Sequence, residues 1–169
     1  QMPASMESYA QEIGRVGRDG QPGYAVLFYA GDDLHIHQHM IEREYPTRQQ
    51  VERFYRLLTS QTPITAEALA SIEMTEEMAE LLTFYVEKSG RVLGETAADD
   101  VIQGIWQETE KRKRLKRQKL SEMISYVEGN EECLRKRMNQ YFGELKHGYA
   151  LHCCSRCGLD RRDYLEDRT

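Results

Sequence analysis

Four cysteines gather in the last 37 residues of the 169-residue chain: Cys133, Cys153, Cys154 and Cys157. Cys154 and Cys157 have the C-x2-C spacing, which lets two thiolates reach one tetrahedral ion from a tight turn. Gly158 follows directly and relieves the backbone after that turn. Residues 1–10 show no basic start followed by an apolar core, so we expect an intracellular chain with reduced thiols. Clustered reduced thiols of this kind point first to a metal site.

The sequence alone does not decide which residue is the fourth ligand or which metal is bound. Adjacent Cys153 and Cys154 can both bind one ion only if the backbone bends sharply between them, so His152 and His147 are alternative ligands. A closed site of four protein ligands leaves no position for water, which makes zinc structural rather than catalytic. An iron–sulfur cluster and unmetallated thiols are the other two interpretations.

A second group of residues that could bind a ligand is the arginine pair in the segment QEIGRVGRDG, residues 11–20. Arg15 and Arg18 lie three residues apart, and a glycine precedes each of them. Guanidinium groups on such a loop form forked hydrogen bonds to phosphate oxygens, and glycines let the backbone approach closely. A surface loop with two solvated arginines would have the same composition.

Charge is strongly segregated along the chain. The formal net charge of −5 argues against a nucleic-acid binder. Seven of the nine residues 111–119 are nevertheless cations, whereas acids collect at residues 73–80 and 95–100. This segregation can produce a positive face on an acidic protein, although a solvated helix face is the alternative.

The elements that must position these groups are mostly helical. The patterns predict helices over residues 5–16, from Asp33 to about Glu44, from about Trp106 to Gly129, and from Cys133 to Gly143. Residues 24–29, YAVLFY, are bounded by glycines and predict a buried strand. Apolar residues of the last two helices are expected to face inward: Leu115, Leu120, Met123, Ile124, Val127, Met138 and Phe142.

The middle of the chain predicts three short helices that begin after Thr47, Thr65 and Thr75 as amino-terminal caps. With a possible β element at residues 90–94, they have the proportions of a winged helix, which any three-helix bundle would share. Four aromatic residues are expected in the core rather than on a base-stacking platform: Phe54, Tyr55, Phe84 and Tyr85.

Three histidines at alternating positions, His35, His37 and His39, could suggest a second metal site. They fall within the helix expected after Asp33, where His35 and His39 share a face and His37 does not. We therefore expect solvated or packed histidines rather than ligands.

Two motifs carry a resemblance to a known family. Gln11 to Gly20, as Q-x-x-G-R-x-G-R-x-G, is similar to the last conserved motif of superfamily-two helicases, and with Tyr9-Ala10 and residues 27–29 it looks like the RecQ family. The later segments resemble the RecQ zinc-binding module: RQKLSEM at 117–123, Cys133, YFGE at 141–144, and Cys154-x2-Cys157 with Leu159-Asp160. The two motifs stand in the family's order and cover about half of the chain.

The resemblance implies a mainly α chain in three parts. Residues 1–42 would be the end of a second RecA-like α/β helicase lobe, 43–105 a winged-helix-like insertion, and 106–169 a RecQ-type zinc-binding module that forms a zinc-stapled helical hairpin. It further implies a parent ATP-dependent helicase that unwinds DNA from 3′ to 5′ in repair or recombination, cytoplasmic and associated with the nucleoid.

Partners and cofactors follow from the same resemblance. The expected partners are DNA, as single strands and duplex junctions, and the amino-terminal helicase lobe of the same parent chain. Structural Zn²⁺ would bind this chain, with ATP and Mg²⁺ in the intact parent only. No membrane partner is expected, because no run approaches the roughly 18 apolar residues needed to cross a bilayer.

Site roles are implied residue by residue. Arg18 would act as an arginine finger on the nucleotide γ-phosphate, and Arg15 and Gln11 would couple the nucleotide to lobe closure. The 169 residues contain no G-x-x-x-x-G-K-[ST] loop, so we expect them to be inactive alone. DNA-backbone contacts are expected from eight basic residues: Lys111, Arg112, Arg114, Arg117, Lys119, Arg135, Lys136 and Arg156.

Two departures from the family pattern qualify these expectations. Usual members show C-x2-C-x2-C, whereas Leu151 stands at the first position here and Cys153 would have to replace it. About 60 to 70 residues also separate the lobe from the zinc module, an insertion found in shorter RecQ-like proteins. The alternative is that the chain is a free-standing zinc-containing winged-helix protein with a DNA-binding or regulatory function.

Overall fold

The computed structural model describes residues 2–21, 23–60, 63–90, 97–129, 132–144 and 152–160. These residues form seven α-helices, one 3-10 helix and no strand, which confirms a mainly α chain. They fall into two compact units, Gln1–Leu34 with Lys119–Thr169, and His35–Gln118. The division lies within α2 (Gly31–Glu44) and within α6 (Ala98–Glu128), so each of these helices contributes to both units.

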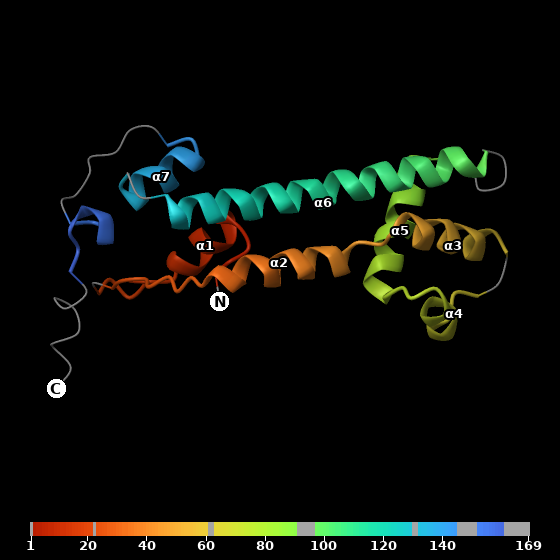
Figure 1. Ribbon diagram of the computed structural model, residues 1–169, viewed down its shortest axis with the longest axis horizontal. Coiled ribbons are helices and arrows are strands. Elements are labelled where there is room, and N and C mark those ends of the chain that lie inside the picture. The colour runs from red at the N-terminus through yellow and green to blue at the C-terminus, as the bar shows by residue number, and fades with distance from the viewer. Residues whose placement is uncertain are drawn as a thin grey trace. The chain divides into compact units, whose positions relative to one another are not determined.

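The unit His35–Gln118 is built around an apolar core. In Figure 1, α3 (Arg48–Thr59), α4 (Ala66–Ser71) and α5 (Glu76–Ser89) gather at the amino-terminal part of α6. Side chains from all four helices form one buried cluster: Val51, Phe54, Tyr55, Leu69, Ile72, Met74, Met78, Ala79, Leu82, Tyr85, Val86, Val101, Ile102 and Ile105. Burial of this apolar surface is the main force that holds the unit together.

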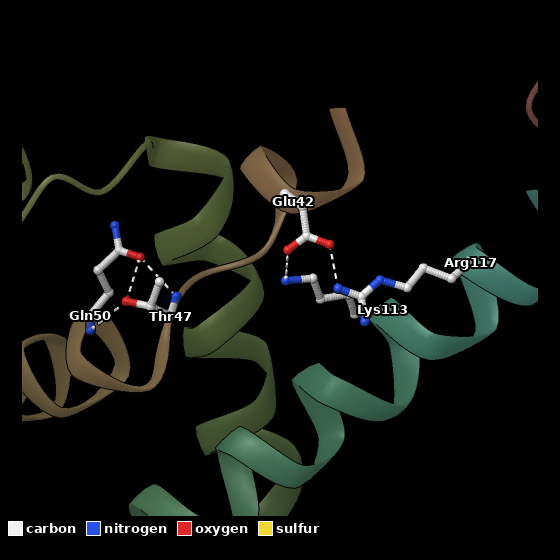
Figure 2. Close-up of polar contacts among 5 residues, drawn as sticks. All are labelled: Glu42, Thr47, Gln50, Lys113 and Arg117. Atoms are coloured by element: carbon white, nitrogen blue, oxygen red, sulfur yellow. Dashed lines mark hydrogen bonds and ion pairs between the residues drawn. The ribbon is translucent and has the colours of Figure 1, made fainter. Parts of the chain in front are cut away.

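Each short helix begins at the threonine that the sequence predicts. The hydroxyls of Thr47, Thr65 and Thr75 accept hydrogen bonds from backbone N–H groups of the first turn. Thr47 and Gln50 form a reciprocal capping box, visible in Figure 2. These bonds satisfy donors that a helix leaves free at its start. The possible β element beyond Gly90 falls on residues 91–94, outside the described residues, so the winged-helix form stays a prediction.

One of the four aromatic residues predicted for the core lies on the surface. Phe54, Tyr55 and Tyr85 are buried, but 51% of Phe84 is exposed. Successive residues on a helix point about 100° apart, and here α5 turns Tyr85 and Val86 towards the core, which leaves Phe84 on the solvent side. Tyr85 takes the inward position.

The predicted strand at residues 24–29 is not present. Residues 23–30 carry no regular secondary structure, and Tyr24, Val26 and Phe28 are 38%, 49% and 72% exposed. A strand needs a neighbour that accepts and donates its backbone hydrogen bonds. No segment in the described part of the chain pairs with this one, which explains the extended, exposed run.

Helix boundaries differ from the sequence expectations at two places. α1 (Met6–Ile13) begins after Ser5, and its last residue, Ile13, lies three residues before the predicted end, with Gly14 as the cap. α6 begins at Ala98, eight residues before the predicted start at Trp106. Val101 of the added turns packs into the core of the unit His35–Gln118, which stabilises the earlier start.

The last described helix, α7 (Leu134–Tyr141), begins directly after Cys133 as predicted. Phe142 caps its end and is 45% exposed, so the prediction of an inward Phe142 is wrong. Leu115 of α6 is 52% exposed, whereas Leu120 and Met123 are buried. Five residues turn a helix by about 500°, which places Leu115 roughly 140° away from Leu120.

Candidate metal centre and nucleic-acid interface

The four cysteine sulfurs meet at one point. All four Sγ atoms lie within 4.8 Å of one another. Cys133 Sγ is 3.4 Å from Cys153 Sγ and 4.0 Å from Cys154 Sγ, and Cys157 Sγ is 3.9 and 3.6 Å from the same two atoms. A tetrahedral ion with Zn–S bonds of about 2.3 Å separates its sulfurs by about 3.8 Å. The four thiols therefore fit a single zinc ion.

A short, tightly folded segment brings three of these thiols together. His152 adopts a left-handed φ of 59°, Cys154 is extended, and Ser155–Cys157 form one 3-10 turn. The turn ends at Gly158, whose φ of 83° suits a residue without a Cβ. The Cys154 carbonyl accepts hydrogen bonds from the N–H groups of Cys157 and Leu159, at 2.9 and 3.1 Å. This geometry lets adjacent Cys153 and Cys154 serve the same site.

The alternative histidine ligands receive no support from the described geometry. His152 Nδ1 lies 3.2 Å from the Gly158 carbonyl, and the cluster of possible metal ligands comprises the four cysteines without it. His147 and Leu151 fall outside the described residues. The described donor set is therefore four thiols.

The electrostatics of the site also favour a cation. Burial raises the pKa of the Cys154 thiol, but N–H groups of Leu134, Arg156 and Cys157 donate to it and bring its pKa down to about 7. Hydrogen bonds with Cys133 and Cys154 raise the pKa of Cys157 to about 12. Four neighbouring thiolates repel one another, so they can all ionise only around a cation.

Two arginines, Arg156 in this segment and Arg137 on α7, donate hydrogen bonds to the end of α6. Arg156 donates to the carbonyls of Tyr126, Val127 and Glu132, the closest at 3.0 Å to Val127. Arg137 of α7 donates to the carbonyls of Ser125 and Tyr126 at 2.8 and 3.1 Å. The last carbonyls of a helix have no intrahelical partner and carry negative partial charge. We call Arg137 and Arg156 the arginine clamp.

The sequence did not reveal the structural part of this clamp. It predicted Arg156 as a DNA contact and did not single out Arg137. The available signal was the predicted helix end near Gly129, because a helix end needs donors for its final carbonyls. Lysines and arginines that follow this helix end in the sequence were candidate donors to its last carbonyls.

A further ion pair joins α1 to α6 within the unit Gln1–Leu34 with Lys119–Thr169. Lys119 Nζ lies 2.8 Å from Glu7 Oε1, and the Tyr141 hydroxyl donates to the same oxygen at 3.1 Å. The Lys119 ammonium lowers the pKa of Glu7 to about 2. Tyr9 and Tyr126 add a tilted ring contact at 5.6 Å.

The arginine loop follows α1 as the sequence predicts. Gln11, Arg15 and Arg18 are all exposed. The loop turns at Gly17, whose φ is 71°, and Arg18 Nε donates to the Gly14 carbonyl at 3.2 Å. The loop thus presents both guanidinium groups to solvent next to the end of α1.

The basic run on α6 is partly neutralised inside its own unit. Figure 2 shows the Glu42 carboxylate between Lys113, at 2.6 Å, and Arg117. Lys116 pairs with Glu44. This arrangement lowers the charge available to an outside partner.

The eight predicted DNA contacts therefore separate into two groups. Five are engaged within the chain: Arg117 with Glu42, Lys119 with Glu7, Lys136 with Glu132, Arg156 with carbonyls, and Arg112 with the Tyr85 hydroxyl. Lys111, Arg114 and Arg135 are exposed and have no ion-pair partner within the described residues. These three are the available cations of the predicted set.

The histidines after Asp33 lie on α2, as expected. His37 is 8% exposed, whereas His35 and His39 are on the surface. In the described part of the chain, they belong to no cluster of three possible metal ligands.

Comparison with known proteins connects this geometry to one family. Residues 79–160 match the RecQ zinc-binding family model. The chain is 29% identical to the probable ATP-dependent DNA helicase RecS of Bacillus subtilis over 94% of its own length and 31% of that relative. It is 44% identical to the ATP-dependent DNA helicase RecQ of Pasteurella multocida over 30% of its length and 8% of the relative.

A shorter match has higher identity. Over 18% of this chain and 3% of the relative, the chain is 61% identical to the ATP-dependent DNA helicase Q-like 5 of Arabidopsis thaliana. The chain thus spans about a third of the RecS relative and a small part of the others. No solved structure matches it. Among the described helices, none combines the length and apolarity needed to span a bilayer.

Proposed function

We propose that this chain is a segment of the RecQ family and forms the carboxy-terminal region of an ATP-dependent DNA helicase. The main observation that supports this proposal is the cluster of four thiols within 4.8 Å. The cluster lies inside the part of the chain that matches the RecQ zinc-binding model. The parent enzyme unwinds DNA from 3′ to 5′ in repair or recombination and acts at the nucleoid. ATP and Mg²⁺ are bound by the parent, with its amino-terminal helicase lobe.

Zinc has a structural role in this proposal. Cys133, Cys153, Cys154 and Cys157 hold the ion, which supplies the positive charge that four thiolates require. Cys133 lies directly before α7, and the other three ligands lie in the segment that carries Arg156. Zinc binding therefore fixes α7 and the arginine clamp at the end of α6.

DNA contacts are assigned to the unpaired cations first. Lys111, Arg114 and Arg135 bind phosphate groups without breaking an ion pair of the chain. The engaged residues of the predicted set would have to give up an internal partner to do the same, which makes their contribution smaller. Contacts of this kind read the backbone and not the base sequence, as a translocating enzyme requires.

The salt dependence of DNA binding tests this assignment. In the intact enzyme, Arg114→Ala should lower the slope of log K against log salt by about one for each lost phosphate contact. Lys88→Ala on α5 removes one exposed cation that is outside the predicted DNA-binding set and should leave the slope unchanged. Equal slopes for Arg114→Ala and Lys88→Ala would contradict the assignment.

Arg18 is proposed as the arginine finger, with Gln11 and Arg15 as coupling residues. The exposed loop after α1 supports this role, since Arg15 and Arg18 are both on the surface, where a finger must lie to contact a nucleotide held by another lobe. Phosphoryl transfer depends largely on charge stabilisation, and such a finger accelerates it by roughly 10³ to 10⁵.

The test uses the intact enzyme. Arg18→Ala should abolish DNA-stimulated ATP hydrolysis and leave DNA affinity within about twofold, because phosphate contacts to DNA lie elsewhere. Arg43→Ala on α2, an exposed arginine with no ion pair among the described residues, is the matched control. Normal ATP hydrolysis by Arg18→Ala would contradict the finger assignment.

A further inference from the structure

A surface groove in the unit His35–Gln118 is lined by apolar and acidic side chains. It has a volume of ≈ 420 Å³ and lies between residues of α3, α4 and α5. Phe54 and Leu69 line it from the buried core, whereas Ile64 and Phe84 line it with 41% and 51% of their surface exposed. Two large apolar side chains are thus left in water at the edge of an apolar depression.

Three carboxylates border this apolar surface. Glu76, Glu80 and Glu87 of α5 line the groove, and no lysine or arginine is among the described residues that do so. All three are exposed, and none forms an ion pair with another described residue. Their spacing of four and seven residues places them along one side of the helix. The groove therefore combines an apolar floor with a border of carboxylates that form no ion pair among the described residues.

Phe84 already receives a cation from its own helix. Lys88 Nζ lies 6.0 Å from the centre of the Phe84 ring, within the range of a cation–π contact. The ring face and the nearby carboxylates attract the same kind of group. A positively charged side chain beside an apolar one satisfies both.

We propose that this groove binds a basic amphipathic helix of a partner protein. Apolar side chains spaced three and four residues apart would fill the depression beside Phe84 and Ile64, as in other helix-in-groove complexes. Lysines or arginines on the flanks of that helix would face Glu76, Glu80 and Glu87. The groove is a partner site separate from the zinc site and the arginine loop, and it does not depend on the function proposed above.

Two other occupants fit the groove less well: charge opposes nucleic acid, and α6 of a second copy lacks an apolar face. Phosphate groups of nucleic acid would lie beside three carboxylates, and like charges oppose such a contact. A second copy of this chain offers α6 as its basic helix, but Leu115 is the only large apolar residue exposed on that helix in the described residues. Lys113, Lys116 and Arg117 of α6 are already paired with Glu42 and Glu44.

The test measures binding of a fluorescent 14-residue helix made of leucine and lysine, with leucines on one face. It uses the full 169-residue chain loaded with zinc, in about 0.15 M salt, where weak surface attraction is screened. We expect saturable binding with one peptide per chain. The corresponding leucine–glutamate peptide should not bind.

Two substitutions of equal charge locate the site. Glu80→Lys in the groove should weaken binding at least about tenfold, whereas Glu108→Lys on α6, outside the groove, should change it less than about twofold. Phe84→Ala should also weaken binding about tenfold and leave the fold intact, since the ring is half exposed. Unchanged helical circular dichroism of each variant excludes loss of folding.

Three outcomes would overturn the proposal. Equal weakening by Glu80→Lys and Glu108→Lys would show general attraction to an acidic protein. Dimerisation in sedimentation experiments that Phe84→Ala abolishes would assign the groove to a second copy. Single-stranded DNA that displaces the peptide from the wild-type groove would assign it to nucleic acid.

Discussion

The unit His35–Gln118 and the cysteine-bearing segments around α7 are stabilised by different means. In the former, four helices bury fourteen core residues, including Phe54 and Leu82 at 1% and 0% exposure. α7 has no buried residue, and of the four cysteines only Cys154 is buried. Apolar burial therefore explains the first region, whereas the second depends on four thiols and the arginine clamp.

The two means of stabilisation suit different kinds of function. A well-packed helical unit tolerates surface variation, so its exposed faces are free to acquire partner sites such as the groove beside Phe84. The segment around the cysteines has little apolar surface to bury, and its conformation is coupled to ligand binding. Its role is to hold a shape that a metal ion fixes.

Removal of zinc should produce the largest difference between the two regions. Chelation at neutral pH should lower hydrogen-exchange protection of the α7 amides by at least about 100-fold, because zinc binding supplies the folding free energy of that region. Amides of α5 should change by less than about threefold. Mass spectrometry of exchanged peptides measures both. Equal loss of protection in α5 would contradict two independent sources of stability.

Substitution in the apolar core should destabilise the unit His35–Gln118 and leave the zinc site intact. Leu82→Ala removes a side chain that is 0% exposed and should lower the free energy of unfolding by about 2–5 kcal/mol. Zinc content should stay unchanged. Leu115→Ala, which truncates a leucine that is 52% exposed, is the matched control and should cost less than about 0.5 kcal/mol. Urea unfolding followed by circular dichroism gives these values.

The arginine clamp should contribute less than either the core or the metal. Arg137→Ala removes the donors to the carbonyls of Ser125 and Tyr126 and should cost about 1–2 kcal/mol. Arg135→Ala on the same helix removes an exposed arginine without an ion pair and should be nearly neutral. If Arg137→Ala and Arg135→Ala unfold at the same urea concentration, the arginine clamp does not contribute to the free energy of unfolding.

The smallest effect is expected at Glu7. Its pKa in the folded chain is about 2 rather than 4.5, so it stabilises the fold above pH 4.5 and loses this effect as the pH falls towards 2. Wild type should be slightly more stable than Glu7→Gln at pH 6, and the difference should shrink between pH 4.5 and 2. Comparing the two proteins at each pH cancels acid effects on the zinc site. A difference that stays constant with pH would contradict the Lys119 ion pair.

Local signals in the sequence predicted the features that local chemistry controls. Thr47, Thr65 and Thr75 cap helices because a hydroxyl satisfies a backbone donor in the first turn wherever that turn occurs. The C-x2-C spacing predicted a shared metal site for Cys154 and Cys157 for the same kind of reason, since such a turn places two thiols near one ion. The spacing left the fourth ligand open between a cysteine and a histidine. The helix of the three histidines was predicted from its pattern as well.

Features that depend on distant partners could not be predicted in this way. The apolar run at residues 24–29 has strand composition, but a strand exists only beside another strand. The early start of α6 depends on core residues contributed by three other helices. Arg156 looks like a phosphate ligand in sequence, and only the fold shows that carbonyls at the end of α6 accept its hydrogen bonds.

Native mass spectrometry of the reduced, folded 169-residue chain tests the central claim most directly. We expect one zinc ion per chain, with the mass of four protons lost on binding. Cys157→Ser should lose most of this zinc, whereas Leu82→Ala should keep it. A folded, reduced chain without zinc would contradict the metal centre and, with it, the proposed role of this region in a RecQ-type helicase.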